Sequence, residues 1–437
     1  MSCFIWGLGL FALVSQFNSC ANIGNVTPQE QVEKNAMDTV PYTKLGKADN
    51  KTIVISKDVD LCGSVCIIPP EVTLHCQGGV IKNGIIIGQN TKIKQRGPVF
   101  NKVTIKGTWI VPSISTEMFV DLDYDNALKD VVALSNSNIH NRIIVDVGKY
   151  YVSVGKDAET CILLGSNTEF VLNGDIILAP NKYKSYYIIQ AKGDNIYISG
   201  KGSIIGDKHT HTGNEGEWGM GVFLRGANYS SIKDITIKDC WGDCVYIGGN
   251  SKNVLIDNCI IDNGRRQGIS IVKADSVTIR NCKISNVSGT NPQYAILLEP
   301  NPNCIVDHVA IENVEVKDCI GGIASTRLKN EQSRRIGLVQ IRNCNVSGLK
   351  KNPLRMTGCE SVFIENCIVN ATNSHSAIYT NKSQHVIVKD NTINVTKRLY
   401  STIRNAAFKA VGKTGFKPIE IIEPKSQEIK NNRIVEK

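Results

Sequence analysis

The chain has 437 residues and a formal net charge of +10, with 42% hydrophobic residues, only 6% aromatic residues and 37 Gly. This composition is apolar enough to fold, but it lacks the aromatic and Leu-rich helical patterns of a globular α/β enzyme. The prominence of Val, Ile, Asn and Gly predicts many short strands joined by tight turns, and the scarcity of aromatic side chains for base stacking argues against nucleic acid as a partner.

The N-terminal 20 residues contain no charged side chain. Their apolar run, residues 4–14, is too short to span a bilayer and lies where a signal h-region belongs. Cys20 resembles the acylated cysteine of a bacterial lipoprotein signal. We therefore predict a signal peptide at 1–20 and a cell-surface or periplasmic lipoprotein held in the outer membrane by Cys20, or otherwise a secreted protein. Residues 21–45 are polar and aperiodic, which predicts a flexible tether rather than a buried strand.

Residues 46–158 are predicted to form an N-terminal β region and a cap. Residues 125–134 have apolar side chains at helical spacing, and residues 142–152 read as a buried strand with a turn at Gly148. This arrangement resembles the N-terminal cap of pectate-lyase-superfamily β-helix proteins, in which an acidic helix precedes a strand ending in Gly-x-Tyr, here Gly148-Lys149-Tyr150. The resemblance extends to about residue 395, and it implies that the helix closes the end of the apolar stack.

A local pattern recurs along the rest of the chain: an apolar residue, a polar residue, Asn or Asp, and then Cys. Repeats about 19 to 32 residues apart indicate a solenoid, in which equivalent residues lie above one another at about 4.8 Å. Cysteines in such a column are small buried hydrophobes, so we expect them to be reduced. The predicted fold is all-β, a single-stranded right-handed parallel β-helix, with rungs at 159–395 and a C-terminal cap at 396–437. The Cys positions of the pattern are Cys240, Cys259, Cys282, Cys344 and Cys367, with Val314 and Asn391 as substitutes.

The strands that follow the Cys turns form a second column. If Val222, Val245, Ile269 and Ile296 point inward, the alternating residues face outward on one external surface. The residues predicted to line that surface are Tyr246, Ser270, Leu297 and Glu299, with Arg225 at its foot.

Trp218, Trp241 and Arg265 are predicted to lie in register just before these strands. An exposed stripe of this kind would be a sugar platform, because aromatic faces pack on pyranose rings and Arg pairs with carboxylates; the alternative is that the tryptophans pack against a neighbouring loop. The adjacent Gly-rich segment 206–219 holds His209 and His211, which could contact substrate or simply be solvated. No third metal ligand is evident, so we predict neither a metal nor another cofactor.

The sharpest cluster of polar residues spans three rungs and resembles the polygalacturonase-like glycosidases. Asp243 matches the second Asp of the family's Asp-Asp-Cys rung, and Gly268-Ile269-Ser270-Ile271 matches the end of its Gly-His-Gly-x-Ser-Ile rung. The chain departs from the family at Gly242, which replaces the first Asp, and at Arg266-Gln267, which replaces Gly-His. It also lacks the family's Arg-x-Lys rung.

Asp243 and Glu299 are the predicted catalytic carboxyls. Two rungs separate them by about 9.6 Å, at the upper edge of the spacing of about 6.5–9.5 Å that an inverting glycosidase uses. Glu217 is the second candidate partner, and a crowded or half-buried carboxyl would have a raised pKa and could act as the acid. Arg265 or Arg266 would orient a uronate or keep a carboxyl ionised. The plainer alternatives are a turn Asp and an Arg-paired Glu.

Three functions remain open from the sequence. The first is a glycoside hydrolase acting on an acidic, uronic-acid-containing polysaccharide, which the basic segment 325–437, with 20 Lys and Arg against 8 Asp and Glu, would suit unless it is simply a solvated surface. The second is a polysaccharide lyase with Arg266, Arg265 or a loop His as base, although no Asp cluster for Ca²⁺ is evident. The third is a non-catalytic glycan-binding surface lipoprotein or adhesin. The protein would be a monomer or a homotrimer.

Overall fold

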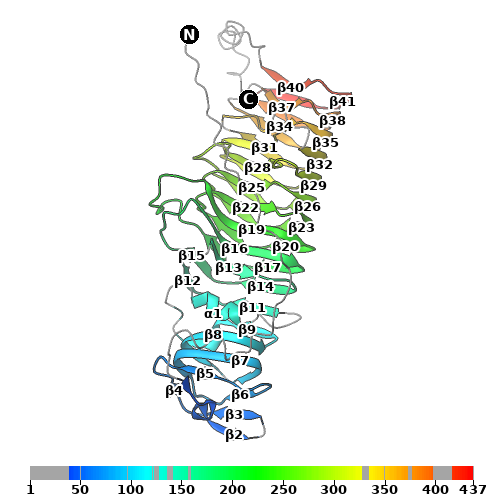
Figure 1. Ribbon diagram of the computed structural model, residues 1–437. Helices are drawn as coiled ribbons and strands as arrows, with labels where there is room; N and C mark the ends of the chain where they lie inside the picture. Colours follow the sequence, from blue (N-terminus) through cyan, green and yellow to red (C-terminus); the bar gives the residue numbers. More distant parts are fainter. Residues whose placement is uncertain are drawn as a thin grey trace, which may run out of the picture.

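The computed structural model describes residues 39–49, 51–95, 97–120, 122, 127–134, 141–155, 159–326, 334–348, 350–372, 376–396 and 416–436. These residues form an elongated stack of short strands that rises from the N-terminal region to the C-terminal rung (Figure 1). The predicted signal peptide with Cys20 lies outside the described residues.

The N-terminal region is a nine-stranded sheet in which the long strands β7 and β8 pair in parallel. Thr39–Val40 pairs with β5 and Leu45 is buried, so these residues of the segment predicted as a tether belong to the fold. The strands are β1 (Thr39–Val40), β2 (Lys47–Asp49), β3 (Thr52–Ile55), β4 (Val59–Asp60), β5 (Val65–Ile67), β6 (Thr73–Cys76), β7 (Ile81–Gln95), β8 (Phe100–Ile110) and β10 (Phe119–Val120), with 3-10 helices η1 (Tyr42–Leu45) and η2 (Thr116–Met118).

Three further sheets, which we call the first, second and third sheets, run along the remaining stack, and every strand pair in them is parallel. The first sheet contains β9 (Ser113–Ser115), β11 (Asn141–Val145), β14 (Thr168–Leu172), β17 (Ile196–Gly200), β20 (Ser230–Lys233), β23 (Ser251–Asp257), β26 (Ala274–Arg280), β29 (Ile305–Glu312), β32 (Arg335–Arg342), β35 (Cys359–Glu365), β38 (His385–Lys389) and β41 (Ser426–Lys430).

The second and third sheets supply the other two strands of each rung. The second sheet contains β12 (Lys149–Val152), β15 (Asp175–Leu178), β18 (Ser203–Ile205), β21 (Thr236–Lys238), β24 (Ile260–Asp262), β27 (Lys283–Ser285), β30 (Glu315–Lys317), β33 (Asn345–Gly348), β36 (Ile368–Ala371), β39 (Thr392–Val395) and β42 (Arg433–Glu436). The third sheet contains β13 (Thr160–Leu164), β16 (Ser185–Asp194), β19 (Trp218–Asn228), β22 (Asp243–Gly248), β25 (Gln267–Ile271), β28 (Tyr294–Leu298), β31 (Gly321–Ser325), β34 (Leu354–Thr357), β37 (Ser376–Asn381) and β40 (Lys417–Ile422).

The helix expected at 125–134 is α1 (Ala127–Ala133), and it lies at the base of the rungs (Figure 1). Its buried side chains include Leu128 and Val131, and it contacts β8, β12 and β13. At the other end, β40, β41 and β42 extend all three sheets by one more rung. The described part of the predicted C-terminal cap is therefore a rung of the solenoid.

The Cys column is confirmed as part of the interior. Cys259 and Cys282 are buried, and each thiol donates to a carbonyl of its own turn, at 3.3 Å and 3.1 Å respectively. The Asn or Asp before each Cys position has a left-handed backbone, as in Asn258 with φ 52° and Asn281 with φ 56°, which explains the residue choice because Asn and Asp tolerate this conformation. None of the described cysteines forms a disulfide.

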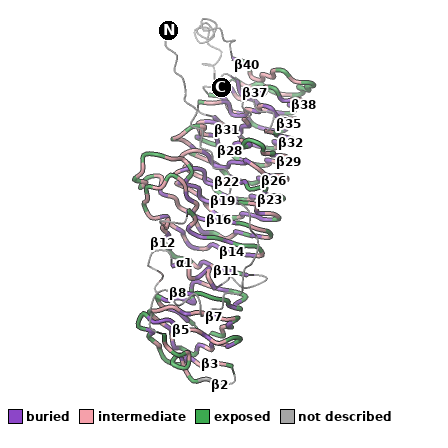
Figure 2. The backbone as a smooth tube through the Cα atoms, viewed as in Figure 1, coloured by how far each residue is buried: buried purple, intermediate pink, exposed green. Residues whose placement is uncertain are grey.

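The core is the inside of the stack, where inward-facing side chains from all three sheets meet. Figure 2 shows buried segments alternating with more exposed ones along the strands. The third sheet has the register predicted from the sequence, because Val222 pairs with Val245, Val245 with Ile269, and Ile269 with Ile296. The prediction that this register exposes Ser270 and Leu297 is wrong, because both are buried. Tyr246 and Glu299 are partly exposed.

Candidate active site

The four residues predicted to be catalytic meet around one guanidinium group. Arg266 Nη1 lies 2.9 Å from Asp243 Oδ2, and Arg266 Nη2 lies 2.8 Å from Glu299 Oε1. Glu217 Oε2 approaches from the loop before β19, at 3.8 Å from Arg266 Nε. We call Asp243, Glu299, Glu217 and Arg266 the carboxylate cluster. A single planar guanidinium bridges the carboxyls of Asp243 and Glu299, so these lie within about 8 Å of each other, closer than their two-rung separation predicted.

Two residues of the middle rung complete the cluster. Ser270 Oγ donates to Asp243 Oδ2 at 2.6 Å, and Gln267 Nε2 donates to Glu299 Oε1 at 2.7 Å. Both side chains are buried. Gln267 occupies the position where the polygalacturonase-like pattern has His, so on this chain the position supplies an amide donor to a carboxylate.

Asp243 has a strongly perturbed acidity. Its side chain is fully buried, and this burial raises its pKa to about 7, against the lowering effects of Arg266 and of the Ser270 hydrogen bond; the nearby charge of Glu299 raises it further. Burial lowers the pKa of Arg266, but Asp243, Glu299 and Glu217 together raise it above the ordinary value of an arginine. Arg266 is therefore a permanent cation, whereas Asp243 changes charge near neutral pH.

The carboxyls differ in their access to solvent. The side chain of Asp243 is 0% exposed, whereas that of Glu299 is 19% and that of Glu217 is 33% exposed. A bound molecule can therefore reach Glu299 and Glu217 in this conformation, while Asp243 lies beneath Arg266. The sequence paired Asp243 with Glu299 first and named Glu217 as second candidate; burial favours Glu217 and Glu299 as the pair in contact with a ligand.

Removing Arg266 tests the cluster as a buried ion pair. We expect Arg266→Gln to lower the free energy of unfolding by about 3 kcal/mol near pH 8, because it leaves a buried carboxylate without its counter-ion. The loss should be smaller near pH 5, where Asp243 can take up a proton. Urea unfolding at the two pH values measures this. Arg280→Gln, in an exposed pair with Asp257, is the control, and equal losses in both variants would contradict the assignment.

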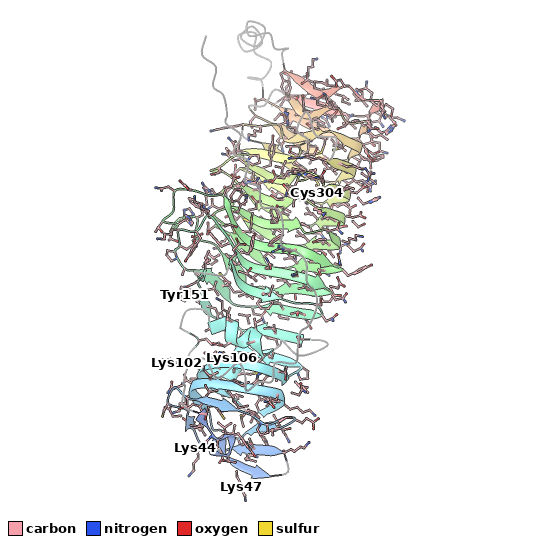
Figure 3. The ribbon with its side chains drawn as sticks, in the orientation of Figure 1. Lys44, Lys47, Lys102, Lys106, Tyr151 and Cys304 are labelled. Carbon is pink, nitrogen blue, oxygen red and sulfur yellow. The ribbon has the colours of Figure 1, made fainter. Side chains whose placement is uncertain are left out.

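A groove of about 430 Å³ lies on the outer surface of the third sheet. None of the four cluster residues lines it, but Trp218, the residue after Glu217, and Asn301, two residues after Glu299, do. Three predicted substrate-binding residues line it: Trp218, Arg225 and Tyr246. The groove also has an aromatic floor that the sequence did not reveal, because the ring of Phe223 lies 4.8 Å from that of Tyr187 and 5.0 Å from that of Tyr246. We call this the aromatic groove; Cys304, labelled in Figure 3, is among its lining residues.

Tyr246 connects the groove to the cluster. Burial raises the pKa of Tyr246 to about 12; its hydrogen bond with Asn301 lowers it, and the charges of Asp243 and Glu299 raise it. Asn301 also lines the groove, together with the cations Arg225 and Lys273 and the anion Glu159. A ligand in the groove therefore lies next to the carboxylate cluster and meets both aromatic and charged side chains.

The predicted Trp–Trp–Arg stripe is only partly a surface platform. Trp218 is 47% exposed, but Trp241 is covered: the His211 ring stacks on it at 4.0 Å, and Arg265 Cζ lies 3.6 Å from its ring centroid. Sugar contact by Trp241, Arg265 and His211 therefore stays a prediction, and the packing around Trp241 does not support it. The tryptophan instead packs against the neighbouring loop, the alternative that the sequence left open.

His209 is the exposed histidine of the loop. Its Nε2 lies 2.9 Å from Asn263 Nδ2 and 3.3 Å from Asp239 Oδ1, on the side of the loop that contacts the second sheet. The side chain of His211 is fully buried against Asp207. Within the described ranges, no group of three or more His, Cys, Asp and Glu side chains is arranged to hold a metal ion.

The chain folds as a parallel β-helix with a charged cluster and an aromatic groove on its third sheet. The sequence model of the family described as "Right handed beta helix region" matches residues 131–308. Among the described residues, no helix is long and apolar enough to cross a membrane.

Two curated relatives and one solved structure illustrate the similarity. The uncharacterized protein YclG of Bacillus subtilis (strain 168) is 29% identical over 191 residues, which cover 38% of this chain and 32% of YclG. The SPbeta prophage-derived uncharacterized protein YorA of the same strain is 29% identical over 164 residues, 32% of this chain and 28% of YorA. The matched stretch thus spans about a third of each relative. The structure of pectate lyase Pel9A has a TM-score of 0.43 at 10% identity, over 69% of this chain and 73% of its own.

Proposed function

We propose that this protein is a polysaccharide-cleaving enzyme of the glycoside hydrolase class. One observation carries the proposal: three carboxyl groups surround one guanidinium, and the residue after Glu217, Trp218, lines an aromatic groove on the β-helix surface. Paired carboxyls are the groups that glycoside hydrolysis requires, one to protonate the leaving oxygen and one to activate water or attack the sugar. The groove offers aromatic faces on which sugar rings can pack.

In the proposed site, Glu217 and Glu299 are the carboxyls that touch the substrate. Arg266 holds both, and Asp243 lies beneath it. Asp243 gains or loses its charge near neutral pH. When Asp243 is ionised it neutralises part of the positive charge of Arg266, so Arg266 stabilises the charged forms of the two glutamates less. Asp243 thereby sets the electrostatics of the pair, and the transfer of protons to and from the sugar is the task of Glu217 and Glu299.

The lyase alternative has less support from the geometry. A lyase that used an arginine or a histidine as its base would need that side chain to be deprotonated before it abstracts a proton. Arg266 is surrounded by three carboxyls that raise its pKa, and the side chain of His211 is fully buried. The non-catalytic alternative, a glycan-binding protein, needs only the groove. It would bind a polysaccharide without cleaving it, whereas a hydrolase would cleave it.

We further propose that the substrate is an acidic glycan. Arg225 and Lys273 line the groove, opposed by the single anion Glu159, and a carboxylate on the sugar would pair with these cations. The excess of basic residues in 325–437 would add a longer-range attraction for a polyanion. An exported protein would meet such polymers outside the cell, and acylation at Cys20, tested by labelling with a radioactive fatty acid, would hold it at the outer membrane.

A screen of the protein against acidic and neutral polysaccharides tests the function. Reducing ends and the ultraviolet absorbance of unsaturated uronides are read together. New reducing ends without that absorbance are the expected result. Both signals together would make the enzyme a lyase, and binding without either signal would make it a glycan-binding protein.

The groove can be tested by removing its exposed aromatic side chain. We expect Trp218→Ala to raise KM, or to weaken binding, by about tenfold, because one aromatic–sugar contact contributes about 1–1.5 kcal/mol. Tyr197→Ala, which removes an exposed aromatic on the first sheet, is the matched control. Equal behaviour of the two variants would show that the groove is not the binding site.

A further inference from the structure

The loop between β18 and β19, residues 206–217, is fixed to the stack by a buried polar contact that the proposed chemistry does not use. Asp207 is buried and accepts hydrogen bonds from the Tyr186 hydroxyl, from Asn181 Nδ2 at 2.8 Å and from His211 Nδ1 at 2.7 Å. No sequence pattern marked Asp207 or Tyr186. Their burial and their three-way contact point to a structural demand on this loop, because a buried carboxylate is costly unless it is fully hydrogen-bonded.

This contact continues through a stack of flat groups. The rings of Tyr186 and His211 are nearly parallel at 6.1 Å, and those of His211 and Trp241 are nearly parallel at 4.0 Å. Arg265, which belongs to the next rung, places its guanidinium 3.6 Å from the Trp241 ring centroid. We call Tyr186, His211, Trp241 and Arg265 the stacked array. Trp241 is thus held between the loop below and the rung above.

The array ends at the residue before Glu217. Arg265 Nη1 donates to the carbonyl oxygens of Gly216, at 3.1 Å, and of Trp241, at 3.2 Å. Gly216 has φ +93°, and a Cβ at this position would lie 2.5 Å from Lys184 Cα, so the close approach of the loop to Lys184 requires glycine here. Arg265 therefore holds the backbone directly before Glu217, because the Gly216 carbonyl belongs to the peptide bond that joins these two residues.

We propose that the stacked array positions Glu217, so that His211 and Arg265 are positioning residues of the active site rather than sugar ligands. The inference rests on the proposed function, because it gives the array a task only if Glu217 acts on substrate. His211 anchors the loop through Asp207, Trp241 transmits that placement by stacking, and Arg265 fixes the Gly216 carbonyl. Loss of any one of them releases Glu217 from Arg266 without changing the aromatic groove.

The test combines tryptophan fluorescence with kinetics. In a Trp218→Phe background of the full chain, acrylamide quenching of His211→Ala and Arg265→Ala reports whether Trp241 has become accessible. The kinetics use the same two substitutions with Trp218 intact, on any polysaccharide that the wild type cleaves. Each substitution should lower kcat about tenfold and leave KM unchanged within about twofold, since a displaced carboxyl affects the chemical step more than binding. Arg265→Lys keeps the charge but not the fork of donors, and should give an intermediate kcat.

Thr210→Ala is the control, because Thr210 lies in the same loop and its hydroxyl makes only a 3.5 Å contact to the Asp207 carbonyl. The proposal would be overturned if acrylamide quenched His211→Ala and Arg265→Ala no more than this control. A rise in KM at constant kcat would also overturn it, because His211 and Arg265 would then be substrate ligands. If the wild type cleaves no polysaccharide, the proposed function fails, while the quenching result still decides whether His211 and Arg265 cover Trp241.

Discussion

Replacing Glu299 by Gln is expected to lower kcat for glycan cleavage by about 10³-fold, with KM within about threefold of the wild type. Glu299 Oε1 accepts from both Arg266 Nη2 and Gln267 Nε2, so the carboxylate is oriented from two sides while part of its side chain faces solvent. Gln has the same shape but cannot exchange a proton as a carboxyl does. The expected loss is therefore one of chemistry rather than of fold or binding.

Steady-state kinetics on the polysaccharide identified by screening measures this effect, together with binding of the intact polymer to the variant. Glu315→Gln, which removes an exposed carboxylate from β30 of the second sheet, is the control and should behave as the wild type. A Glu299→Gln enzyme with wild-type kcat would remove Glu299 from the mechanism. This result would contradict the proposed pair of Glu217 and Glu299.

The second large effect concerns stability and pH. In Asp243→Asn the buried carboxyl is lost, and with it a group whose pKa rises from 3.8 to about 7 on folding. Between these two values the folded protein binds the proton and the unfolded chain does not. The stabilisation from Asp243 is thus fully present below pH 3.8 and is lost as the pH rises through about 7. The slope reaches about 1.4 kcal/mol per pH unit, or about 4 kcal/mol over the whole window.

The difference in unfolding free energy between the wild type and Asp243→Asn should therefore fall across this window, and urea unfolding at a series of pH values measures it. Titrating groups outside the carboxylate cluster cancel in the difference. Asp257→Asn is the matched control, because the hydrogen bond from Arg280 lowers the pKa of Asp257 despite the opposing effect of burial. Its stabilisation is present at high pH and lost on acidification, which gives the opposite slope. Parallel curves for the wild type and Asp243→Asn would show that Asp243 titrates normally.

The fold could be predicted from the sequence because a solenoid repeats local information. The Asn–Cys turns and the Val222, Val245, Ile269 column each depend on residues in one rung, and neighbouring rungs repeat them at the strand spacing. The rung register also grouped Asp243, Arg266 and Glu299 on three successive rungs. The short strand β1 and the helix η1 were missed because their segment shows no periodic pattern.

The parts of the site that could not be predicted depend on the irregular loop. The position of loop 206–217 causes His211 to cover Trp241 and brings Glu217 close to Arg266. This loop is an insertion between rungs, and the repeat pattern of the rungs does not determine its path. The raised pKa of Asp243 was expected from crowding or from half-burial against Trp241. In the structure burial is its main cause, with the Glu299 charge adding to it, and Arg266 and Ser270 are the groups in contact with the carboxyl.

The most direct test of the account is to let the enzyme cleave an acidic polysaccharide in water labelled with the heavy oxygen isotope, and to analyse the products by mass spectrometry. The account predicts one labelled oxygen at each new reducing end and no unsaturated uronide, because a carboxylate of the cluster directs water onto the sugar. Unlabelled, unsaturated products would show elimination, and a polymer that is bound but left intact would show a glycan-binding protein; either result would contradict the central claim.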